Sequence, residues 1–421
     1  MVDKNLFPYD LAVVAIFKDE APYLREWLDY HLLAGVEHFY LYNNDSTDGY
    51  AEILKPYVDA NIVTLIDWSG KIMQAPAYND AVIRFKFFCR YIAFVDLDEF
   101  IYPKSGQSIA EVVDGVLSRD ETAAALGINW QCFGSNGQET ADFSRGVLER
   151  FTRRALVDWV VENDENIRGG NTYIKSVANP RLVDYFCGPH YAVYFQEFKA
   201  INSNGAQTWR AGSSPVAADK IVVNHYYTKS REEFFRKINR SDACFPVNSR
   251  DAKRFMLLDR NEVFDDSILT YRDSRIQNFS LTDDAQRFQR AEKVLVDTLT
   301  QCSPFEAPAE FFVCKLETFL TCRRLAQHFG TRIDNRSAEE YALVWLYQTL
   351  TRAETLTYAE VQMFLKALPE ILSRPLPLAK KFLRLTQEVV IPSFCEMLKT
   401  IYDHRKYSEL VELQKFLRLI K

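Results

Sequence analysis

The sequence predicts an α/β fold in which helices flank a mostly parallel sheet, followed by an all-helical C-terminal region. Apolar strand-like runs and helical patterns alternate through the first hundred residues, with connections only a few residues long, as in a doubly wound parallel sheet. After about Ser280 almost every segment has the periodicity of an amphipathic helix. We therefore expect two domains, residues 1–280 and residues 281–421.

Four strands are expected in the first hundred residues, each a run of apolar, β-branched or aromatic side chains. They cover residues 11–17, 38–42, 61–68 and 91–95. The first and fourth runs are apolar throughout, which is typical of strands covered on both faces. Pro22 stands where the first helix begins, a position that tolerates proline, and Thr47 or Asp48 is placed to cap the second helix.

The rest of the first domain is expected to extend this sheet with strands of mixed direction. The expected elements are a helix over 109–117, a strand over 123–130, short strand-like runs at 172–177, 189–191 and 220–227, and a helix over 232–240.

Bulk composition excludes several protein classes. The net charge of −6 is spread along 421 residues without a block of like charges, which disfavours a nucleic-acid binder that relies on phosphate neutralisation. The eight cysteines form no Cys-x-x-Cys pair, so most are expected to be buried thiols in a reducing compartment. No Gly-x-Gly-x-x-Gly or P-loop pattern follows an expected strand, which argues against dinucleotide oxidoreductases and P-loop NTPases.

The sequence shows neither a signal-peptide pattern at its start nor a run of about 18 apolar residues. We therefore expect a cytoplasmic protein that can associate peripherally with the inner face of a membrane through its C-terminal helices. The basic residues on these amphipathic stretches are Lys380, Lys381, Arg384, Lys415 and Arg418. The alternative is that they form an ordinary solvated face.

Polar side chains follow the expected strands where each strand ends. Ligands of parallel α/β sheets bind outside the carboxyl ends of the strands, so a site is expected at this edge. Asp96 and Asp98 follow the fourth strand, and on an extended segment residues i and i+2 point to the same side. Two such carboxylates suit Mg²⁺ or Mn²⁺ shared with a phosphorylated substrate, although two solvated acids would give the same pattern.

Four motifs in a fixed order then give the chain a family likeness. Residues 17–31, 43–49, 94–101 and 224–235 resemble the corresponding motifs of glycosyltransferase family 2-like and family 92 type enzymes. The likeness covers roughly residues 10–275. It implies a GT-A, Rossmann-like fold, a nucleotide-sugar donor (usually a UDP-sugar) and a divalent cofactor, Mn²⁺ or Mg²⁺.

The resemblance also implies roles for single residues. Asp96 and Asp98 match the Asp-x-Asp metal ligands, and His225 matches a downstream histidine that completes the metal site, although a packed histidine at a strand end is the alternative. Lys229 is placed to meet the diphosphate, where a cation stabilises the leaving group. The predicted donor-binding residues are Lys18, Glu20, Asp45, Asp48, Asn79, Asp96 and Lys229.

An inverting transfer needs an aspartate or glutamate that deprotonates the acceptor hydroxyl. Asp142 and Glu139 follow the 133–137 loop closely enough to reach an acceptor and are the predicted catalytic residues, with Asp142 preferred. The other acids that remain open are Asp158, Glu162, Asp164 and Asp184. The aromatic residues that either stack on acceptor sugars or fill the core are Trp130, Phe133, Trp159 and Trp209.

The expected function is a metal-dependent, inverting glycosyltransferase, a hexosyltransferase. It would move a sugar from a nucleotide-diphosphate donor to a glycan or glycolipid acceptor in bacterial surface polysaccharide or lipopolysaccharide synthesis. A non-catalytic nucleotide-sugar-binding or scaffold protein is the alternative. A nucleotidyltransferase is disfavoured because no glycine-rich, basic signature follows the first strand.

Overall fold

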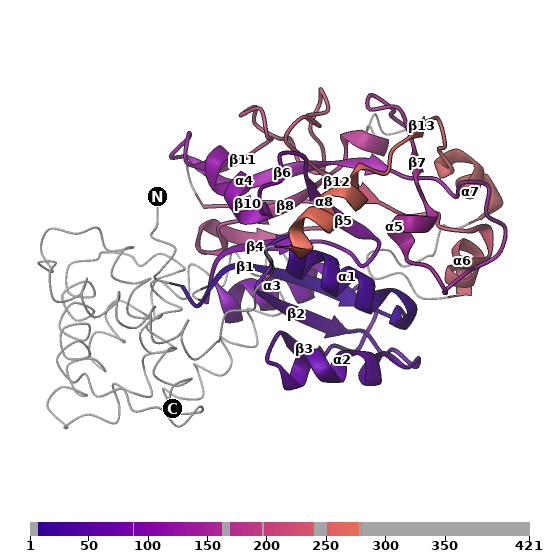
Figure 1. The fold of residues 1–421 in the computed structure, drawn as a ribbon. Helices are drawn as coiled ribbons and strands as arrows, with labels where there is room; N and C mark the ends of the chain where they lie inside the picture. The colour runs from indigo at the N-terminus through magenta and orange to yellow at the C-terminus, as the bar shows by residue number, and fades with distance from the viewer. Residues whose placement is uncertain are drawn as a thin grey trace, which may run out of the picture. The chain divides into compact units, whose positions relative to one another are not determined.

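The computed structural model describes residues 7–86, 88–161, 169–195, 198–239, 251–277 and 279, drawn in colour in Figure 1. These residues fall almost entirely within one compact unit of the chain, Tyr9–Leu281. The predicted helical domain 281–421, with its basic stretches, lies outside the described residues.

Strands and helices alternate through the first part of this unit, and short strands dominate its middle. The order is β1 (Tyr9–Phe17), α1 (Ala21–Leu33), β2 (His38–Asn43), α2 (Tyr50–Asp59), β3 (Val63–Asp67), α3 (Gln74–Phe85), β4 (Cys89–Phe94), β5 (Glu99–Pro103), α4 (Ile109–Leu117), β6 (Ala123–Cys132), α5 (Val147–Arg150), β7 (Arg153–Arg154), η2 (Gly170–Thr172), β8 (Ile174–Ala178), η3 (Pro180–Leu182), β9 (Val183–Phe186), β10 (Ala192–Tyr194), β11 (Lys199–Ile201), β12 (Ile221–His225), α6 (Arg231–Arg236), η4 (Lys237–Asn239), α7 (Ala252–Leu258), β13 (Val263–Phe264) and α8 (Ser267–Ile276).

The central sheet has nine strands in the order β3-β2-β1-β4-β8-β6-β12-β5, with β11 beside β6. The strands β1, β2, β3 and β4 pair in parallel, which confirms the predicted parallel sheet. β8 runs antiparallel to both β4 and β6, and β12 runs parallel to β6 but antiparallel to β5. The predicted mixed extension of the sheet is therefore also confirmed.

These directions decide which chain segments meet. Because β8 is antiparallel to both of its neighbours, β6 and β12 point the same way as β1 and β4. The carboxyl ends of β1, β4, β6 and β12 therefore lie at one edge of the sheet, together with the start of β8. Polar residues that are far apart in the sequence are brought to this edge.

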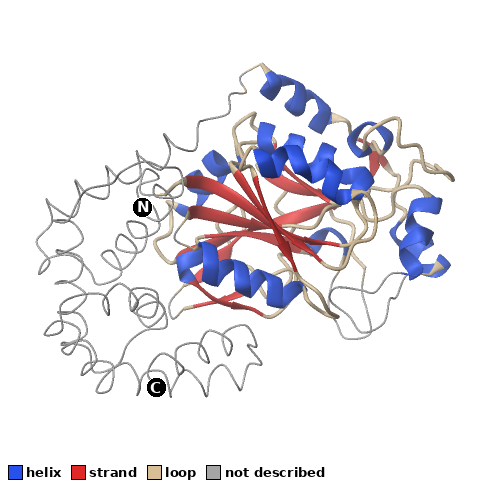
Figure 2. Cartoon of the chain, turned by 90° about the horizontal axis from the view of Figure 1, so that it is seen from below, coloured by secondary structure: helices blue, strands red, loops and turns tan. Residues whose placement is uncertain are grey.

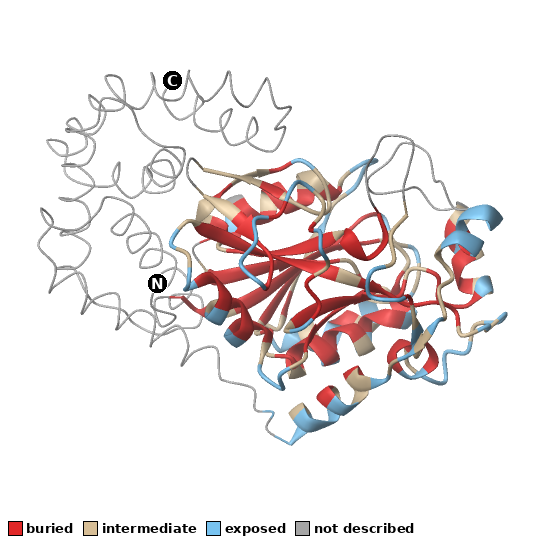
Figure 3. Cartoon of the chain, turned by 90° about the horizontal axis from the view of Figure 1, so that it is seen from above, coloured by how far each residue is buried: buried red, intermediate tan, exposed pale blue. Residues whose placement is uncertain are grey.

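Helices cover both faces of the sheet (Figure 2), and the strands between them are buried along most of their length (Figure 3). α1 packs Leu24, Trp27 and Leu28 into the core. The indole Nε1 of Trp27 donates hydrogen bonds to the backbone oxygens of Glu99, at 2.8 Å, and of Asp96, at 3.1 Å. α1 therefore fixes the turn that joins β4 to β5.

Three local expectations differ from the structure. The predicted strand at 189–191 is wrong, since β10 begins only at Ala192. The predicted helix over 232–240 is α6, which ends at Arg236, followed by a 3-10 turn through Asn239. α2 has no side-chain cap; instead the Asp48 carboxylate accepts a hydrogen bond of 2.8 Å from the backbone N of Ala21 and so caps α1.

Two further expectations bear on the chain's surroundings. Of the cysteines that the structure describes, Cys89 and Cys132 are buried and Cys187 is exposed, all three as free thiols. Across the described part of the chain, no helix combines the length and the apolar character that crossing a bilayer requires.

Candidate functional site

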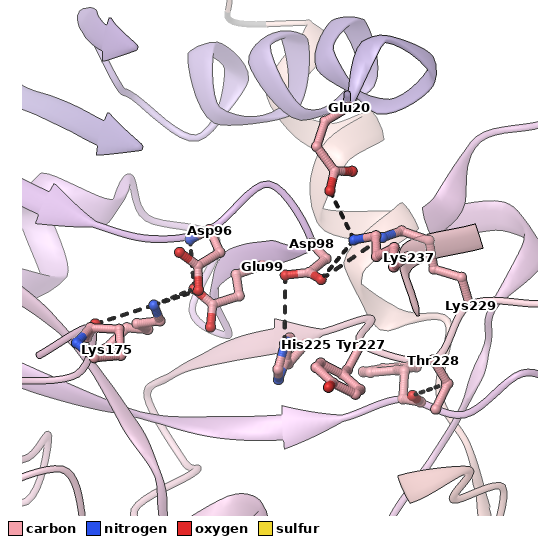
Figure 4. A network of polar contacts seen from close by, with 12 residues as sticks. Glu20, Asp96, Asp98, Glu99, Lys175, His225, Tyr227, Thr228, Lys229 and Lys237 are labelled. Carbon is pink, nitrogen blue, oxygen red and sulfur yellow. Dashed lines mark hydrogen bonds and ion pairs between the residues drawn. The ribbon is translucent and has the colours of Figure 1, made fainter. Parts of the chain in front are cut away.

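The carboxyl-end edge of the sheet gathers a cluster of charged side chains (Figure 4). Glu20 follows β1, Asp96 and Asp98 follow β4, and His225 ends β12. Lys229 lies in the loop between β12 and α6. The sequence prediction that acidic residues at separate strand ends lie close together is therefore correct for Glu20 and Asp98, which contact the same lysine, Lys237.

Asp96 and Asp98 do not face one point, contrary to the expectation for an extended segment. β4 ends at Phe94, and residues 96–99 form a turn in which the backbone N of Glu99 donates to the backbone oxygen of Asp96 at 3.1 Å. The Glu99 carboxylate closes the same turn by accepting from the backbone N of Asp96 at 2.7 Å. Because of this turn, Figure 4 shows Asp96 directed to Lys175 and Asp98 directed to His225 and the other lysines.

Asp98 is the most highly connected acid of the cluster. Its Oδ1 lies 3.6 Å from Nε2 of His225, and its Oδ2 lies 3.4 Å from Nζ of Lys237 and 3.9 Å from Nζ of Lys229. Burial alone would raise the pKa of Asp98, but Lys237 and Lys229 hold it well below its usual range. Asp98 is therefore an ionised carboxylate despite its burial.

Asp96 has a separate set of partners. Its Oδ2 accepts from Nζ of Lys175 at 2.8 Å, and its Oδ1 accepts from Nε2 of Gln74 at 2.6 Å. The Asp96 side chain is 33% exposed, whereas the Lys175 side chain is only 1% exposed. Asp96 is thus the partly open end of an ion pair whose cation is buried.

Lys175 also lies 3.3 Å from Oε2 of Glu99. Burial raises the pKa of Glu99 well above its usual range, which favours the neutral carboxyl. Burial would lower the pKa of Lys175, but the carboxylate of Asp96 raises it well above its usual range. The charged pair at this end of the site is accordingly Lys175 and Asp96. Glu99 is a neutral carboxyl that accepts the hydrogen bond from the backbone N of Asp96.

Lys229 is a buried cation in an uncommon backbone conformation. Its φ is +50°, in the left-handed region, and its Nζ makes no hydrogen bond to the residues that the structure describes. Nζ lies 4.3 Å from the centre of the Tyr23 ring. Burial, followed by the nearby charge of Lys237, lowers the pKa of Lys229 to about 8. An ammonium held in this way is ready to accept an anionic ligand.

A second buried network fixes the loop that carries Lys229. Arg150 and Glu233 form a two-point ion pair, with N–O distances of 2.8 and 2.9 Å, and both side chains are almost fully buried. The Tyr23 hydroxyl donates to Glu233 at 2.9 Å. Ser230 and Glu233 form a capping box at the start of α6. The network therefore holds the residue next to Lys229 in place.

The remaining predicted donor-binding residues lie on two loops and on α3. Asp45 is exposed, has a φ of +56° and accepts from Oγ of Ser69 at 2.6 Å, and this hydrogen bond lowers its pKa. Lys18 follows β1 on the neighbouring loop, and its charge lowers the pKa of Asp45 further. Asp48 caps α1.

Asn79 uses its side-chain amide for packing. Its Oδ1 accepts from the backbone N of Phe186 at 2.7 Å, and its Nδ2 donates to the backbone oxygen of the same residue at 3.0 Å. Asn79 therefore ties α3 to β9, and its assignment as a donor ligand stays a prediction.

The predicted catalytic acids lie on an exposed segment next to α6. The Asp142 carboxylate accepts from Oγ and from the backbone N of Ser144, at 2.6 and 3.0 Å, and these hydrogen bonds lower its pKa. The Glu139 side chain is 74% exposed, 3.7 Å from Arg231. Of the other acids left open, Asp158 is exposed and Asp184 is half-buried, while Glu162 and Asp164 lie outside the described residues.

Three residues of the site were missed from the sequence. Lys237 lies in η4 and contacts Glu20 at 2.9 Å as well as Asp98. Lys175 and Gln74 hold Asp96. The sequence does carry a signal for Lys175, which is the one charged residue in the strand-like run 172–177. A lysine buried in a strand requires an acidic partner.

A divalent cation needs oxygen or nitrogen ligands that converge on one point. Within the described ranges, no three His, Cys, Asp or Glu side chains are arranged as a metal-binding group. Oδ1 of Asp98 and Nε2 of His225 nevertheless lie 3.6 Å apart, close enough to share one ion. An oxygen and an imidazole nitrogen suit Mn²⁺. Asp98 and His225 therefore fit the predicted metal, whereas the role of Asp96 as a third ligand stays a prediction.

The chain is similar to a known protein family and to several plant proteins. The family model for glycosyltransferase family 92 matches residues 13–253. A glycosyltransferase family 92 protein from Ricinus communis is 23% identical over 256 residues, which are 60% of this chain and 42% of that protein. The galactan beta-1,4-galactosyltransferase GALS2 from Arabidopsis thaliana is 33% identical over 100 residues, which are 21% of this chain and 19% of that protein.

The match with solved structures is more distant. The TarS protein of S. aureus in complex with UDP aligns over 83% of this chain and 95% of that chain, with 11% identity and a TM-score of 0.32. This chain spans about two fifths of the length of the curated relatives that match it over the most residues. The family model nonetheless covers more than half of the chain and includes all four motifs as far as residue 235. The chain belongs to glycosyltransferase family 92.

Proposed function

We propose that this chain transfers a sugar from a nucleotide-diphosphate donor to a hydroxyl of a glycan or glycolipid acceptor. The observation that carries the proposal is the convergence of His225, Lys229 and Lys237 on the carboxylate of Asp98. The chain belongs to a glycosyltransferase family, so the ligand proposed for this charged site is a nucleotide sugar.

The chemistry requires stabilisation of the leaving diphosphate. As the bond from the sugar's anomeric carbon to the diphosphate oxygen breaks, negative charge develops on that oxygen. The ammonium groups of Lys229 and Lys237 are held beside Asp98 and supply positive charge there. A divalent cation at Asp98 and His225 would supply Lewis-acid stabilisation of the same charge.

The donor's nucleoside is assigned to the loops after β1 and β2. Glu20 and Asp45 are the residues proposed to bind a uridine, with Lys18 and Asp48 beside them. The loops brace each other, because Oδ1 of Asp19 accepts from the backbone N of Thr47 at 2.7 Å. This contact and the Asp48 cap keep the two loops at a fixed separation. UDP-galactose is the first donor to test, since the Arabidopsis relative is named a galactosyltransferase.

Transfer with inversion requires a carboxylate that removes the proton of the acceptor hydroxyl. Asp142 and Glu139 are the proposed candidates on the described part of the chain. The segment that carries them is tied to α6, where the backbone N of Glu232 donates to the oxygen of Glu139 at 2.9 Å. The predicted product, a bacterial surface polysaccharide, gains no support from the curated relatives reported above, which are plant proteins.

The experiment that tests the proposal is a donor screen. Purified protein is mixed with UDP-galactose, UDP-glucose, UDP-N-acetylglucosamine and GDP-mannose, with and without Mn²⁺, and release of the nucleotide diphosphate is measured. We expect release from one UDP-sugar, and its loss in the Asp98→Asn variant. Nucleotide-sugar binding without turnover for every donor and acceptor would favour the alternative of a non-catalytic binding protein.

A further inference from the structure

Four aromatic rings follow one another away from Asp98, and we call them the aromatic row: His225, Trp130, His190 and Tyr173. The Trp130 ring lies 4.1 Å from the His225 ring and 5.1 Å from both the His190 and Tyr173 rings, measured between ring centres. Tyr173 and His190 stack at 4.8 Å with their planes 10° apart. The row therefore begins at a proposed metal ligand and continues without a gap.

The sheet holds the row in position. Trp130 lies on β6 opposite Val223 of β12, and its backbone N donates to the oxygen of Tyr173 at 2.8 Å. The His190 ring is fixed by a 3.0 Å hydrogen bond between Nδ1 and the backbone oxygen of Ile174 on β8. Trp130 and His225 thus stand on β6 and β12, Tyr173 directly precedes β8, and His190 lies in the loop between β9 and β10.

Trp130, Tyr173 and His190 are half-buried, and Trp130 also packs against the edge of the core. In the described part of the chain, the indole Nε1 of Trp130 is buried and has no hydrogen-bond partner. A buried tryptophan N–H normally finds an acceptor, so one is expected from outside the described protein atoms. Phe133, by contrast, is fully buried against Tyr226 and serves the core.

The backbone of Tyr173 is paired with a turn that carries an exposed indole. Tyr173 forms a β-bridge with Gly212, and Gly212 pairs with Trp209 through hydrogen bonds of 2.9 and 3.1 Å. Trp209 is 76% exposed. An exposed indole presents a large apolar face together with an N–H donor, a combination for which tryptophan is enriched at interfaces.

We propose that the aromatic row and Trp209 form the binding track for an oligosaccharide acceptor of at least two sugar units. The inference rests on the proposed glycosyl transfer and adds the class of its acceptor. Pyranose rings present C–H faces that pack on aromatic rings, and hydroxyls that accept from an indole N–H, so one ligand satisfies both features of the track. Continuity with His225 places the reacting end of the acceptor at the charged cluster and the rest of the chain toward Trp209.

The test is the dependence of binding on acceptor length, measured by isothermal titration calorimetry with and without UDP. The probes are β-1,4-linked galacto-, gluco- and manno-oligosaccharides of two to six units. We expect wild-type affinity to rise with length for one series. Trp209→Ala should weaken binding of the hexasaccharide by about tenfold and leave the disaccharide unchanged. Trp130→Phe keeps a ring but removes the N–H, and should weaken both lengths.

Met256→Ala is the matched control, because Met256 is also an exposed apolar side chain, at 70%, on α7. Unchanged UDP affinity in all three variants will show that they are folded. The track is overturned if the wild type binds none of the oligosaccharides, or if Trp209→Ala binds the hexasaccharide as tightly as the wild type does. Oligosaccharide binding without any binding of UDP would instead overturn the donor function and support the track.

Discussion

The carboxylate of Asp98 and the imidazole of His225 lie 3.6 Å apart, although one residue follows β4 and the other ends β12. β5 runs antiparallel to β12, and Glu99 at its start is the register partner of His225. The pairing of these two strands therefore sets the distance between the two side chains. A cation shared by both would need no rearrangement of the sheet.

The first prediction concerns His225. His225→Ala should raise the Mn²⁺ concentration needed for half-maximal activation of donor hydrolysis by at least about 10–100-fold, since losing only an outer partner of a metal ligand already has an effect of this size. Binding of Mn²⁺ itself, followed by electron paramagnetic resonance, should weaken to a similar extent. An unchanged Mn²⁺ affinity in His225→Ala would show that the imidazole is only a packed ring.

The second prediction concerns Lys229. Lys229→Met removes the ammonium but keeps most of the chain length, so UDP affinity should fall by about tenfold or more, while UMP or uridine affinity changes little. Lys55→Met is the matched control, because Lys55 forms only an exposed pair with Asp59. Equal losses for UDP and uridine would place Lys229 away from the diphosphate.

The third prediction compares Lys175 and Glu99, two buried side chains that lie 3.3 Å apart. Lys175→Met leaves the Asp96 carboxylate without its cation and should lower the free energy of unfolding by about 1–3 kcal/mol, less than for a fully buried pair because the Asp96 side chain is 33% exposed. Glu99→Gln should cost much less, because the raised pKa of Glu99 makes its carboxyl neutral in the folded protein. Urea unfolding measures both variants. Equal destabilisation by the two substitutions would mean that Glu99 is ionised.

The fourth prediction is a pH dependence. Burial works against ionisation of Glu233, but the hydrogen bonds from Arg150 and Ser230 lower its pKa to about 2. A group with a lowered pKa stabilises the fold above its unfolded pKa and loses that contribution as pH falls. Glu233 should therefore contribute about 3 kcal/mol near pH 7 that disappears between roughly pH 5 and pH 2.

The Glu233→Gln variant tests this directly. Its free energy of unfolding, measured by urea titration from about pH 7 to pH 3, should fall less steeply toward acid than that of the wild type. Glu52→Gln serves as the control, since Glu52 is exposed on α2. Parallel curves for Glu233→Gln and the wild type would contradict the assignment.

Much of the fold could be predicted from the sequence because its signals are local. The apolar runs of β1 and β4 and the alternation of strands and helices specify a parallel sheet without knowledge of any contact. The strand order and the antiparallel β8 between β4 and β6 could not be predicted. Strand pairing depends on long-range contacts that no single window of sequence contains.

The same limit explains what was missed in the site. Asp98, His225 and Lys229 were found because they stand in recognisable motifs. Lys237 and Lys175 stand outside those motifs, and their importance arises only when the sheet brings them to Asp98 and Asp96. The expectation that Asp96 and Asp98 face one point was wrong because the strand ends at Phe94 and the chain then turns. The rule that residues i and i+2 point to the same side holds only while the chain stays extended.

The most direct test of the central claim is a calorimetric titration of UDP into the wild type and Asp98→Asn, each with and without Mn²⁺. Asparagine preserves the shape of the side chain but removes the charge that His225, Lys229 and Lys237 surround. We expect Mn²⁺ to tighten UDP binding in the wild type, and we expect this tightening to be lost in Asp98→Asn. Equal tightening by Mn²⁺ in both proteins would contradict a donor-diphosphate site at Asp98.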